Sequence, residues 1–378
     1  MQITVLKETD PNESRVALVP ESVKKLVAMN VGVAIERGAG LAASINDADY
    51  ETAGATISVD RAALLAATDI LLAVNRPADG DLKSLKSGAI VTAFLRPLDE
   101  PKKMAEFVAG GLTAFAIELI PRSTRAQSMD GLSSMATIVG YKAVLIAAER
   151  MPRMFPMLTT AAGTVPPAKV LVLGAGVAGL QAIATARRLG AIVEGFDVRA
   201  AAGEAVRSLG AKFLEIDMGS VQAEDAGGYA REVTEEVMER SRDLIARQAA
   251  QTDCIVTSAQ VPGKRAPILV TEKAVAAMKR GSMIIDLAGS TGGNCSHTRP
   301  GEDVEINGVR IVAPLNLAAT VPLHASQLYS RNLTSFLSIL IRDGQINLDF
   351  NDDIIGSACA VHQGQIVEPR LKAAFDAK

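Results

Sequence analysis

The feature that most constrains the fold is a glycine-rich segment at residues 169–179, with the sequence KVLVLGAGVAG. The run VLVL is typical of a buried strand, and LQAIATARRLG, which follows the glycines, is typical of a helix. Gly174 suits a tight turn, Gly176 leaves the backbone open to a ligand, and Gly179 permits close helix–strand packing. The segment therefore predicts a strand–turn–helix unit whose helix N-terminus binds the pyrophosphate of a dinucleotide.

An acidic residue ends the next predicted strand, IVEGFDVR. A carboxylate at the position of Asp197 accepts hydrogen bonds from the adenosine-ribose hydroxyls and repels a 2′-phosphate. We therefore expect NAD(H) rather than NADP(H). Arg199 weakens this preference, because arginine is the usual partner of that phosphate.

Length and composition limit the class of protein. The 378 residues, 48% of them apolar, suffice for two domains, since single cores stop growing at about 250–300 residues. The net charge of −3 and the lack of a long basic run give no indication of nucleic acid or an anionic membrane surface. The three cysteines are widely spaced, which fits a reducing compartment and does not favour a metal site. The start MQITVLKE is strand-like, and the apolar stretch LTSFLSILI is shorter than the roughly 20 residues that span a bilayer, so we expect a soluble cytoplasmic chain.

Strand-like and helix-like patterns alternate along the chain. The first 120 residues and the stretch from the glycine segment to VRIVAP each predict a parallel sheet with helices on both faces. The tail from residue 322 begins with a helix, ends in short strands, and has no nucleotide-binding pattern of its own. The predicted fold is therefore α/β, with two Rossmann-like domains and a ligand cleft between them. The expected domains are 1–133 with 322–378, and 134–321.

A polar segment at 121–133, PRSTRAQSMDGLS, lies between an apolar strand and an apolar helix. This position, at the carboxyl end of a predicted strand, is where α/β proteins bind ligands. Its amide, hydroxyl and charged groups suit a carboxamide and a ribose; they belong to Arg122, Arg125, Gln127, Asp130 and Ser133. The alternative is a helix cap formed by Ser128 or Asp130, with solvated arginines, and the pattern does not decide between the two.

Two glycine-rich loops have a similar ambiguity. The loop at 224–232, EDAGGYARE, is either a mobile flap that brings Tyr229 onto a ligand or a surface turn. The loop at 285–295, IDLAGSTGGNC, follows a strand and either approaches the same ligand or serves only the turn.

The sequence offers little acid–base chemistry. Oxidation of an alcohol or amine transfers a proton as well as a hydride and needs a positioned acid or base. None of the three histidines, His297, His324 and His362, belongs to an evident pair with an orienting acid. Hydride transfer between two nicotinamides moves no proton at the reacting carbons and needs only placement and exclusion of water.

Four segments carry a family resemblance: TAAGTVPPAKVLVLGAGVAGLQAIATARRLGA, PRSTRAQSMD, DAGGYARE and IDLAGSTGGNC. Together they resemble the soluble NAD(H)-binding components, or split-form alpha subunits, of proton-translocating transhydrogenases in the alanine dehydrogenase/transhydrogenase family. Alanine dehydrogenases share the fold and the pattern ESRVALVPE, which contains Arg15. Where they carry a catalytic lysine, histidine and acid, this chain has Asn75, Arg96 and Ser290, which argues against amino-acid oxidation.

The resemblance implies roles for individual residues. The nicotinamide end would be held by Arg122, Gln127, Asp130 and Ser133, with Gln127 facing an incoming NADP(H). The pyrophosphate would lie on Ala175, Gly176 and Val177, and the adenosine ribose among Asp197, Val198 and Arg199. The residues that close over the nucleotide would be Gly228, Tyr229, Ala259 and Gln260.

The resemblance also implies partners. The chain would form a homodimer that docks, on the inner face of the membrane, on a membrane component and an NADP(H)-binding component. Hydride would pass directly from NADH to NADP⁺ on the partner, coupled to proton translocation by the membrane component. Two other hypotheses stay open: a soluble amino-acid dehydrogenase of the alanine dehydrogenase type, and a non-catalytic NAD(H)-binding regulatory protein.

Overall fold

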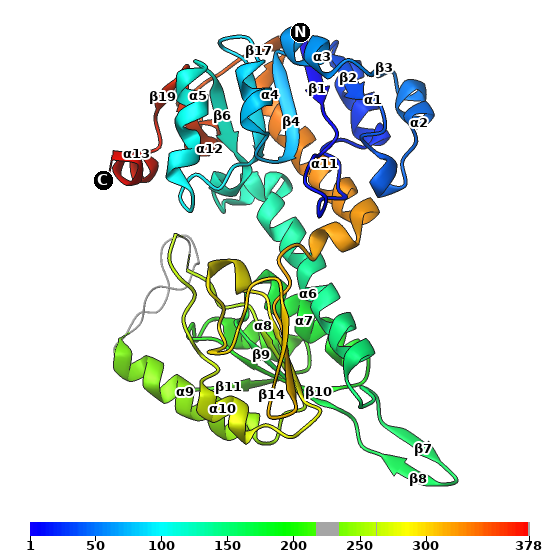
Figure 1. The fold of residues 1–378 in the computed structure, drawn as a ribbon, viewed down its shortest axis with the longest axis vertical. Helices are drawn as coiled ribbons and strands as arrows, with labels where there is room; N and C mark the ends of the chain where they lie inside the picture. Colours follow the sequence, from blue (N-terminus) through cyan, green and yellow to red (C-terminus); the bar gives the residue numbers. More distant parts are fainter. Residues whose placement is uncertain (217–233, 262, 377–378) are drawn as a thin grey trace. The chain divides into compact units, whose positions relative to one another are not determined.

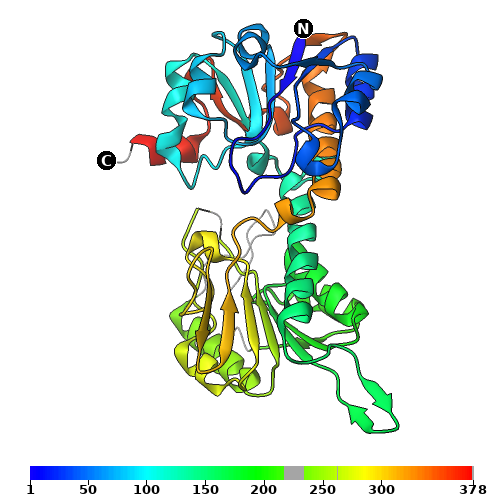
Figure 2. The same cartoon turned by 45° about the vertical axis from the view of Figure 1, so that its right-hand side comes forward.

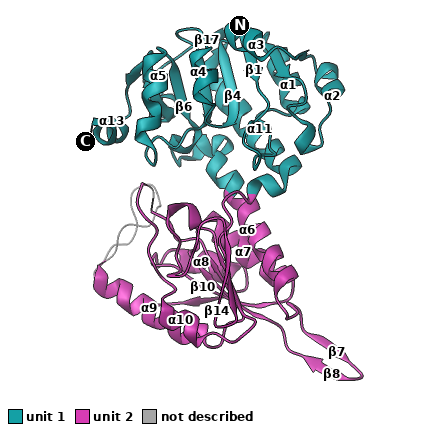
Figure 3. Ribbon diagram, viewed as in Figure 1, with its two compact units in different colours: residues 1–135, 318–378 teal, residues 136–317 magenta. Residues whose placement is uncertain are grey.

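The computed structural model describes residues 1–216, 234–261 and 263–376 (Figure 1). The chain forms two compact units, residues 1–135 with 318–378 and residues 136–317 (Figure 3). Each unit is built on a mostly parallel sheet with helices against it, so the predicted α/β class is confirmed. The predicted domains stay a prediction, because compactness alone does not establish that a unit folds independently.

Unit 1 contains an eight-stranded sheet in the order β19-β18-β6-β5-β4-β1-β2-β3. Its parallel strands are β1 (Gln2–Val5), β2 (Gly32–Glu36), β3 (Thr56–Ser58), β4 (Ile70–Asn75), β5 (Ile90–Phe94) and β6 (Thr113–Ala116). The tail adds two antiparallel strands at one edge, β18 (Cys359–His362) and β19 (Gln365–Ile366). The strand order reverses between β1 and β4, which makes the carboxyl ends of these strands the switch point of the sheet.

Helices cover both faces of this sheet. The main ones are α1 (Pro20–Ala28), α2 (Asp47–Thr52), α3 (Arg61–Ala67), α4 (Asp79–Lys83), α5 (Ala105–Ala109), α11 (Pro322–Leu340), α12 (Asp353–Ala358) and α13 (Pro369–Asp376). On one face, Leu65 of α3 and Phe107 of α5 share a buried cluster with Leu71 of β4. On the other, Phe336 of α11 packs edge-on against Phe115 of β6, with ring centroids 5.3 Å apart. The strand expected to run through residue 120 ends at Ala116, where the 3-10 helix η3 (Ile117–Leu119) begins.

Unit 2 contains a seven-stranded sheet in the order β11-β10-β9-β12-β13-β15-β14. Its parallel strands are β9 (Lys169–Leu173), β10 (Ile192–Phe196), β11 (Lys212–Leu214), β12 (Cys254–Thr257), β13 (Met283–Asp286) and β15 (Val309–Val312). An antiparallel edge strand, β14 (Asp303–Ile306), follows β15 in the sheet. Here the order reverses between β9 and β12.

The side chains of β9 point alternately to the two faces of the sheet, and both faces are covered by helices in unit 2. Val170 and Val172 belong to one buried cluster, together with residues of α6 (Gly131–Arg150) and α7 (Val177–Arg188). Leu171 and Leu173 belong to a second cluster, with residues of α9 (Glu235–Ala249) and α10 (Glu272–Ala277). A strand buried on both faces is expected for a parallel sheet. A further helix, α8 (Ala202–Ser208), follows β10.

Helix α6 is long and apolar enough to cross a membrane by length and composition, and it is the one such helix among the described residues. A helix in a protein core meets the same criteria. Ala143, Val144 and Ala147 of α6 are fully buried and pack in the same cluster as β9. The second half of α6 therefore belongs to the core of unit 2.

A hairpin that we did not predict lies between α6 and β9. Its strands are β7 (Leu158–Thr160) and β8 (Gly163–Val165), and all their residues are exposed. Figure 2 shows the hairpin extending away from the sheet of unit 2. Because it has no buried face, the apolar alternation that marks most strands is missing from its sequence.

The contact between α6 and α7 gives a test of the fold. A β-carbon built on Gly140 would lie 2.1 Å from the carbonyl oxygen of Ala178, a backbone atom that cannot move aside without shifting α7. We expect Gly140→Ala to lower the free energy of unfolding, measured in urea, by about 1–3 kcal/mol, the usual cost of overpacking. Gly80→Ala in α4 is the control, because no atom of the described part of the chain lies within 4 Å of its added β-carbon. The control should be neutral or slightly stabilising, and equal losses in both variants would contradict the packing described here.

Candidate functional site

The glycine turn of unit 2 is shaped by contacts with its own backbone. Gly174, directly after β9, has a φ of +95°, which favours glycine. A β-carbon on Gly174 would lie 2.9 Å from Ser258 Oγ and 3.0 Å from the amide nitrogen of Ala259. A β-carbon on Gly179 would lie 1.8 Å from the carbonyl oxygen of Gly174. Both glycines are therefore required by the protein itself, before any ligand is considered.

Gly176 differs from these two glycines. It precedes α7 with a φ of −78°, a conformation open to any residue, and no atom of the described residues lies within 4 Å of a β-carbon built on it. No side chain among those residues caps the N-terminus of α7. The unpaired N–H groups and the positive dipole end of a helix attract an anion. This end of α7 is thus a candidate anion site beside an unfilled space.

Asp197 ties the end of β10 to the glycine turn. Its carboxylate is nearly buried and accepts a hydrogen bond from the amide of Ala175 at 2.7 Å. The carboxylate also accepts from the backbone N–H of Arg199 at 2.8 Å, and from Nε and Nη2 of the same guanidinium at 2.9 and 2.8 Å. We considered Arg199 a partner for a phosphate, but here it pairs with Asp197. Ribose hydroxyls that bind Asp197 must therefore displace or share this guanidinium.

The loop after β12 lies against the same turn. Ser258 Oγ donates to the carbonyl oxygen of Gly174 at 3.1 Å, and Gln260, which is exposed, follows two residues later. Val198 is half-buried beside the core of unit 2, and Val177 is the first residue of α7. The unit 2 residues predicted to bind a dinucleotide therefore converge at the switch point between β9 and β12. Gly228, Tyr229 and the rest of the 224–232 loop lie outside the described residues.

The polar segment at 121–133 belongs to unit 1. It forms the 3-10 helix η4 (Thr124–Met129) and leads into α6. Asp130 accepts hydrogen bonds from the backbone N–H of Ser133 at 2.8 Å and from Ser133 Oγ at 2.5 Å, which is the capping role we considered as the alternative. The side chains of Arg122 and Gln127 are exposed. The segment thus combines a cap at Asp130 with polar groups on its surface.

Two contacts from the C-terminal region of the chain hold η4. Arg125 donates to Asp352 at 2.7 and 2.8 Å and also pairs with Asp353, whereas the sequence left open whether this side chain binds a ligand or is solvated. The hydrogen bond from Arg125 lowers the pKa of Asp352 to about 2. Asn332 of α11 donates from Nδ2 to the carbonyl oxygen of Ser128 at 2.9 Å. We missed Asn332 because no local pattern indicates a bond between residues so far apart in the chain.

Charged groups with partners inside the protein lie at the switch point of unit 1. Arg15 and Glu13 form a buried ion pair through two contacts, at 2.7 and 2.5 Å, and Asn75 donates to the same carboxylate at 2.8 Å. Glu8 accepts a hydrogen bond from the amide of Val74 at 2.6 Å, and desolvation raises the pKa of Glu8 to about 7. Arg15, the residue shared with alanine dehydrogenases, therefore has a carboxylate partner inside the protein.

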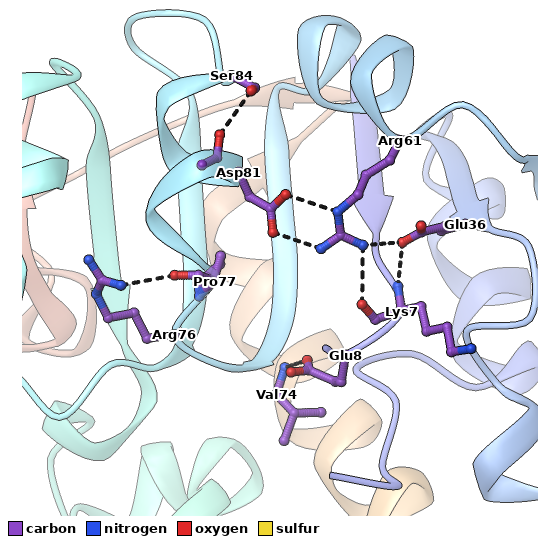
Figure 4. A network of polar contacts seen from close by, with 10 residues as sticks. Lys7, Glu8, Glu36, Arg61, Val74, Arg76, Pro77, Asp81 and Ser84 are labelled. Carbon is purple, nitrogen blue, oxygen red and sulfur yellow. Dashed lines mark hydrogen bonds and ion pairs between the residues drawn. The ribbon is translucent and has the colours of Figure 1, made fainter. Parts of the chain in front are cut away.

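A second network lies beside this one (Figure 4). Arg61 binds Asp81 of α4 through two hydrogen bonds, at 2.9 and 2.7 Å, and Glu36 at the end of β2 through a third, at 2.5 Å. It also donates to the carbonyl oxygen of Lys7, whose amide in turn donates to Glu36. The network joins Lys7, which follows β1, and the end of β2 to α4. It therefore fixes the backbone next to Glu8. Within the described ranges, no three His, Cys, Asp or Glu side chains are placed to hold a metal ion.

Comparison with known proteins identifies relatives over the whole chain. The family model for the alanine dehydrogenase/PNT N-terminal domain matches residues 4–139, and that for the C-terminal domain matches residues 143–369. An NAD(P) transhydrogenase subunit alpha protein of Rhodospirillum rubrum is 44% identical, over 98% of this chain and 99% of that protein.

Solved structures agree with these matches. The crystal structure of transhydrogenase from Sinorhizobium meliloti superposes with a TM-score of 0.85 and 42% identity, over 98% of this chain and 99% of that one. An L-alanine dehydrogenase structure has a TM-score of 0.84 and 26% identity, over 99% of both chains. The resemblance inferred from the sequence is confirmed, and the chain belongs to the alanine dehydrogenase/PNT family.

Proposed function

We propose that this chain is the NAD(H)-binding component of a proton-translocating NAD(P) transhydrogenase. The observation that carries the proposal is full-length similarity at 44% identity to a transhydrogenase alpha subunit, against 26% to the L-alanine dehydrogenase structure. The described residues leave the space beside Gly176 open, which supports the proposal, because the pyrophosphate of a dinucleotide must come close to the backbone at such a turn.

The adenosine and pyrophosphate portion of NADH binds to unit 2 in this proposal. Backbone N–H groups at Ala175, Gly176 and Val177 hold the pyrophosphate at the N-terminus of α7. Asp197 receives the ribose hydroxyls, and Arg199 gives up some of its contacts with the carboxylate to make room for them. The other contacts proposed for the nucleotide come from Val198, Gly228, Tyr229, Ala259 and Gln260.

The nicotinamide end is assigned to the polar segment of unit 1. Asp130 and Ser133 bind each other and so form a fixed pair of polar groups, while the amide of Gln127 is exposed and available to a second nucleotide. In the proposal Gln127 faces NADP(H) bound on the partner component, and Arg122 helps to hold the carboxamide. NADH supplies the hydride; the protein's role is to align the two rings and exclude water.

The partners follow from the same assignment. A subunit named alpha belongs to a complex, and we propose an NADP(H)-binding component and a proton-translocating membrane component as the other members. The chain then lies in the cytoplasm, on the inner face of the membrane, and acts as a homodimer. Met157, Leu158 and Val165, at the exposed hairpin, offer an apolar surface for such assembly.

The alternative of an amino-acid dehydrogenase is disfavoured by residues of both units. Arg15 pairs with Glu13, and Asn75, which stands where alanine dehydrogenases have lysine, donates to the same carboxylate. Arg96 and Ser290 provide no acid–base group in place of the histidine and the acid. A purely regulatory NAD(H)-binding protein shares the binding site and differs only in that no hydride is transferred.

Substitution of Gly176 tests the binding site. Gly176→Ala should lower the free energy of unfolding by no more than about 1 kcal/mol, the cost of alanine at a helix N-cap, because the backbone is unstrained and the added methyl meets no described atom. We expect NADH to bind at least tenfold more weakly, measured by fluorescence titration, because the methyl group occupies the place of the pyrophosphate. Gly80→Ala, which is also unobstructed, should bind NADH normally. Normal binding by Gly176→Ala would show that no pyrophosphate approaches this turn.

Substitution of Gln127 separates hydride transfer from binding. Gln127→Asn should slow transfer from NADH to NADP⁺ on an added NADP(H)-binding component at least tenfold, since a small misplacement of the reacting rings is costly. NADH affinity should stay within twofold. Gln251→Asn, at another exposed glutamine, is the matched control and should transfer hydride at the normal rate. An unchanged rate in Gln127→Asn would restrict the segment to a capping role.

A further inference from the structure

The loop after β12 packs against the glycine turn and is hydrogen-bonded to it. The amide of Ser258 donates to the carbonyl oxygen of Leu173 at 2.8 Å, and Ser258 Oγ donates to that of Gly174. The backbone of Ala259 approaches Gly174 closely: a β-carbon built on Gly174 would lie 3.0 Å from the amide nitrogen of Ala259. A shift of this loop therefore changes the turn on which the pyrophosphate is proposed to lie.

One buried side chain from a different loop holds Ala259. Asn294 is fully buried, and its Oδ1 accepts a hydrogen bond from the amide of Ala259 at 3.0 Å. Its Nδ2 donates to the carbonyl oxygens of Ala259 and Pro267, both at 2.8 Å. A side-chain amide is both donor and acceptor, so Asn294 satisfies both backbone polar groups of Ala259 as a neighbouring strand would.

Asn294 is itself held by a buried carboxylate. Asp286, at the end of β13, is fully buried and accepts hydrogen bonds from the amides of Asn294 at 2.7 Å and Cys295 at 3.0 Å. It also accepts from Thr257 Oγ1 at 2.9 Å and Thr298 Oγ1 at 2.5 Å. A carboxylate with this many donors is well compensated and fixes the loop that carries Asn294.

We propose that Asn294 is a positioning residue for dinucleotide binding: through Ala259 it holds the loop after β12 against the glycine turn. The inference rests on the proposed function, because the ligand whose binding it affects is NADH. A loop that is fixed before the ligand arrives need not be ordered on binding, so the loss of Asn294 weakens affinity. Asn294 is fully buried and acts through its hydrogen bonds to Ala259, so we assign it no role in the transfer of hydride.

The test compares Asn294→Ala with a control at Thr252, which lies just before β12, at the opposite end of that strand from the loop that Asn294 holds. We expect Asn294→Ala to raise the Kd of NADH about tenfold, with the rate of hydride transfer at saturating NADH within twofold of normal. The control is Thr252→Val, which removes a buried hydroxyl that donates to the carbonyl oxygen of Gln248 at 2.9 Å. It should lower the Tm and leave the Kd unchanged, because it lies at the amino end of β12.

Four outcomes would overturn the proposal. A Kd that is normal in Asn294→Ala, or raised equally in Thr252→Val, would assign Asn294 a general structural role only. If Asn294→Ala does not fold, Ser258→Ala tests the other contact that holds this loop against the turn, from Ser258 Oγ to the carbonyl oxygen of Gly174. We expect a threefold rise in Kd; an unchanged Kd would count against the proposal. Failure of the unsubstituted chain to bind NADH would overturn the proposed function itself, and the inference with it.

Discussion

The close approach of helix α7 to the turn after β9 is the contact on which unit 2 depends. At Gly179 the helix backbone comes so near the carbonyl oxygen of Gly174 that no side chain fits between them. Because the helix is held there, its N-terminus, at Gly176, lies at the carboxyl edge of the sheet. Asp197 and the loop after β12 then complete the surroundings of the turn through bonds to Ala175 and Gly174. Backbone packing thus shapes the candidate anion site, and hydrogen bonds from side chains fix its surroundings.

The two units obey the same topological rule with different results. In each sheet the strand order reverses once, between β1 and β4 in unit 1 and between β9 and β12 in unit 2. The described residues leave the turn at Gly176 unobstructed, whereas the unit 1 switch point holds Glu8 and the Glu13–Arg15 pair. Burial of Arg15 with an internal carboxylate uses charge that could otherwise bind a substrate anion. This difference agrees with the proposal that the chain binds a nucleotide and does not oxidise an amino acid.

Local sequence patterns predicted the main helices and strands, but they did not predict hydrogen bonds between residues far apart in the chain. The strand VLVL, the glycine turn and the helix that follows could be inferred because period, turn chemistry and packing all agree there. The α/β class followed from the alternation of strands and helices. The Arg199–Asp197 pair was missed because a guanidinium two residues from a carboxylate has several possible partners, and only the folded loop selects one. The bond between Asn294 and Ala259 joins two loops that become neighbours only when β12 and β13 pair.

The central claim is that this chain transfers hydride only together with a partner. The most direct measurement mixes the purified chain with a transhydrogenase NADP(H)-binding component and follows transfer from NADH to NADP⁺, with pyruvate and ammonium offered to the chain alone in parallel. The account predicts transfer in the mixture and none with pyruvate and ammonium. Oxidation of NADH by pyruvate and ammonium with the chain alone would contradict it and establish an amino-acid dehydrogenase, and no transfer in either reaction would leave only a regulatory role.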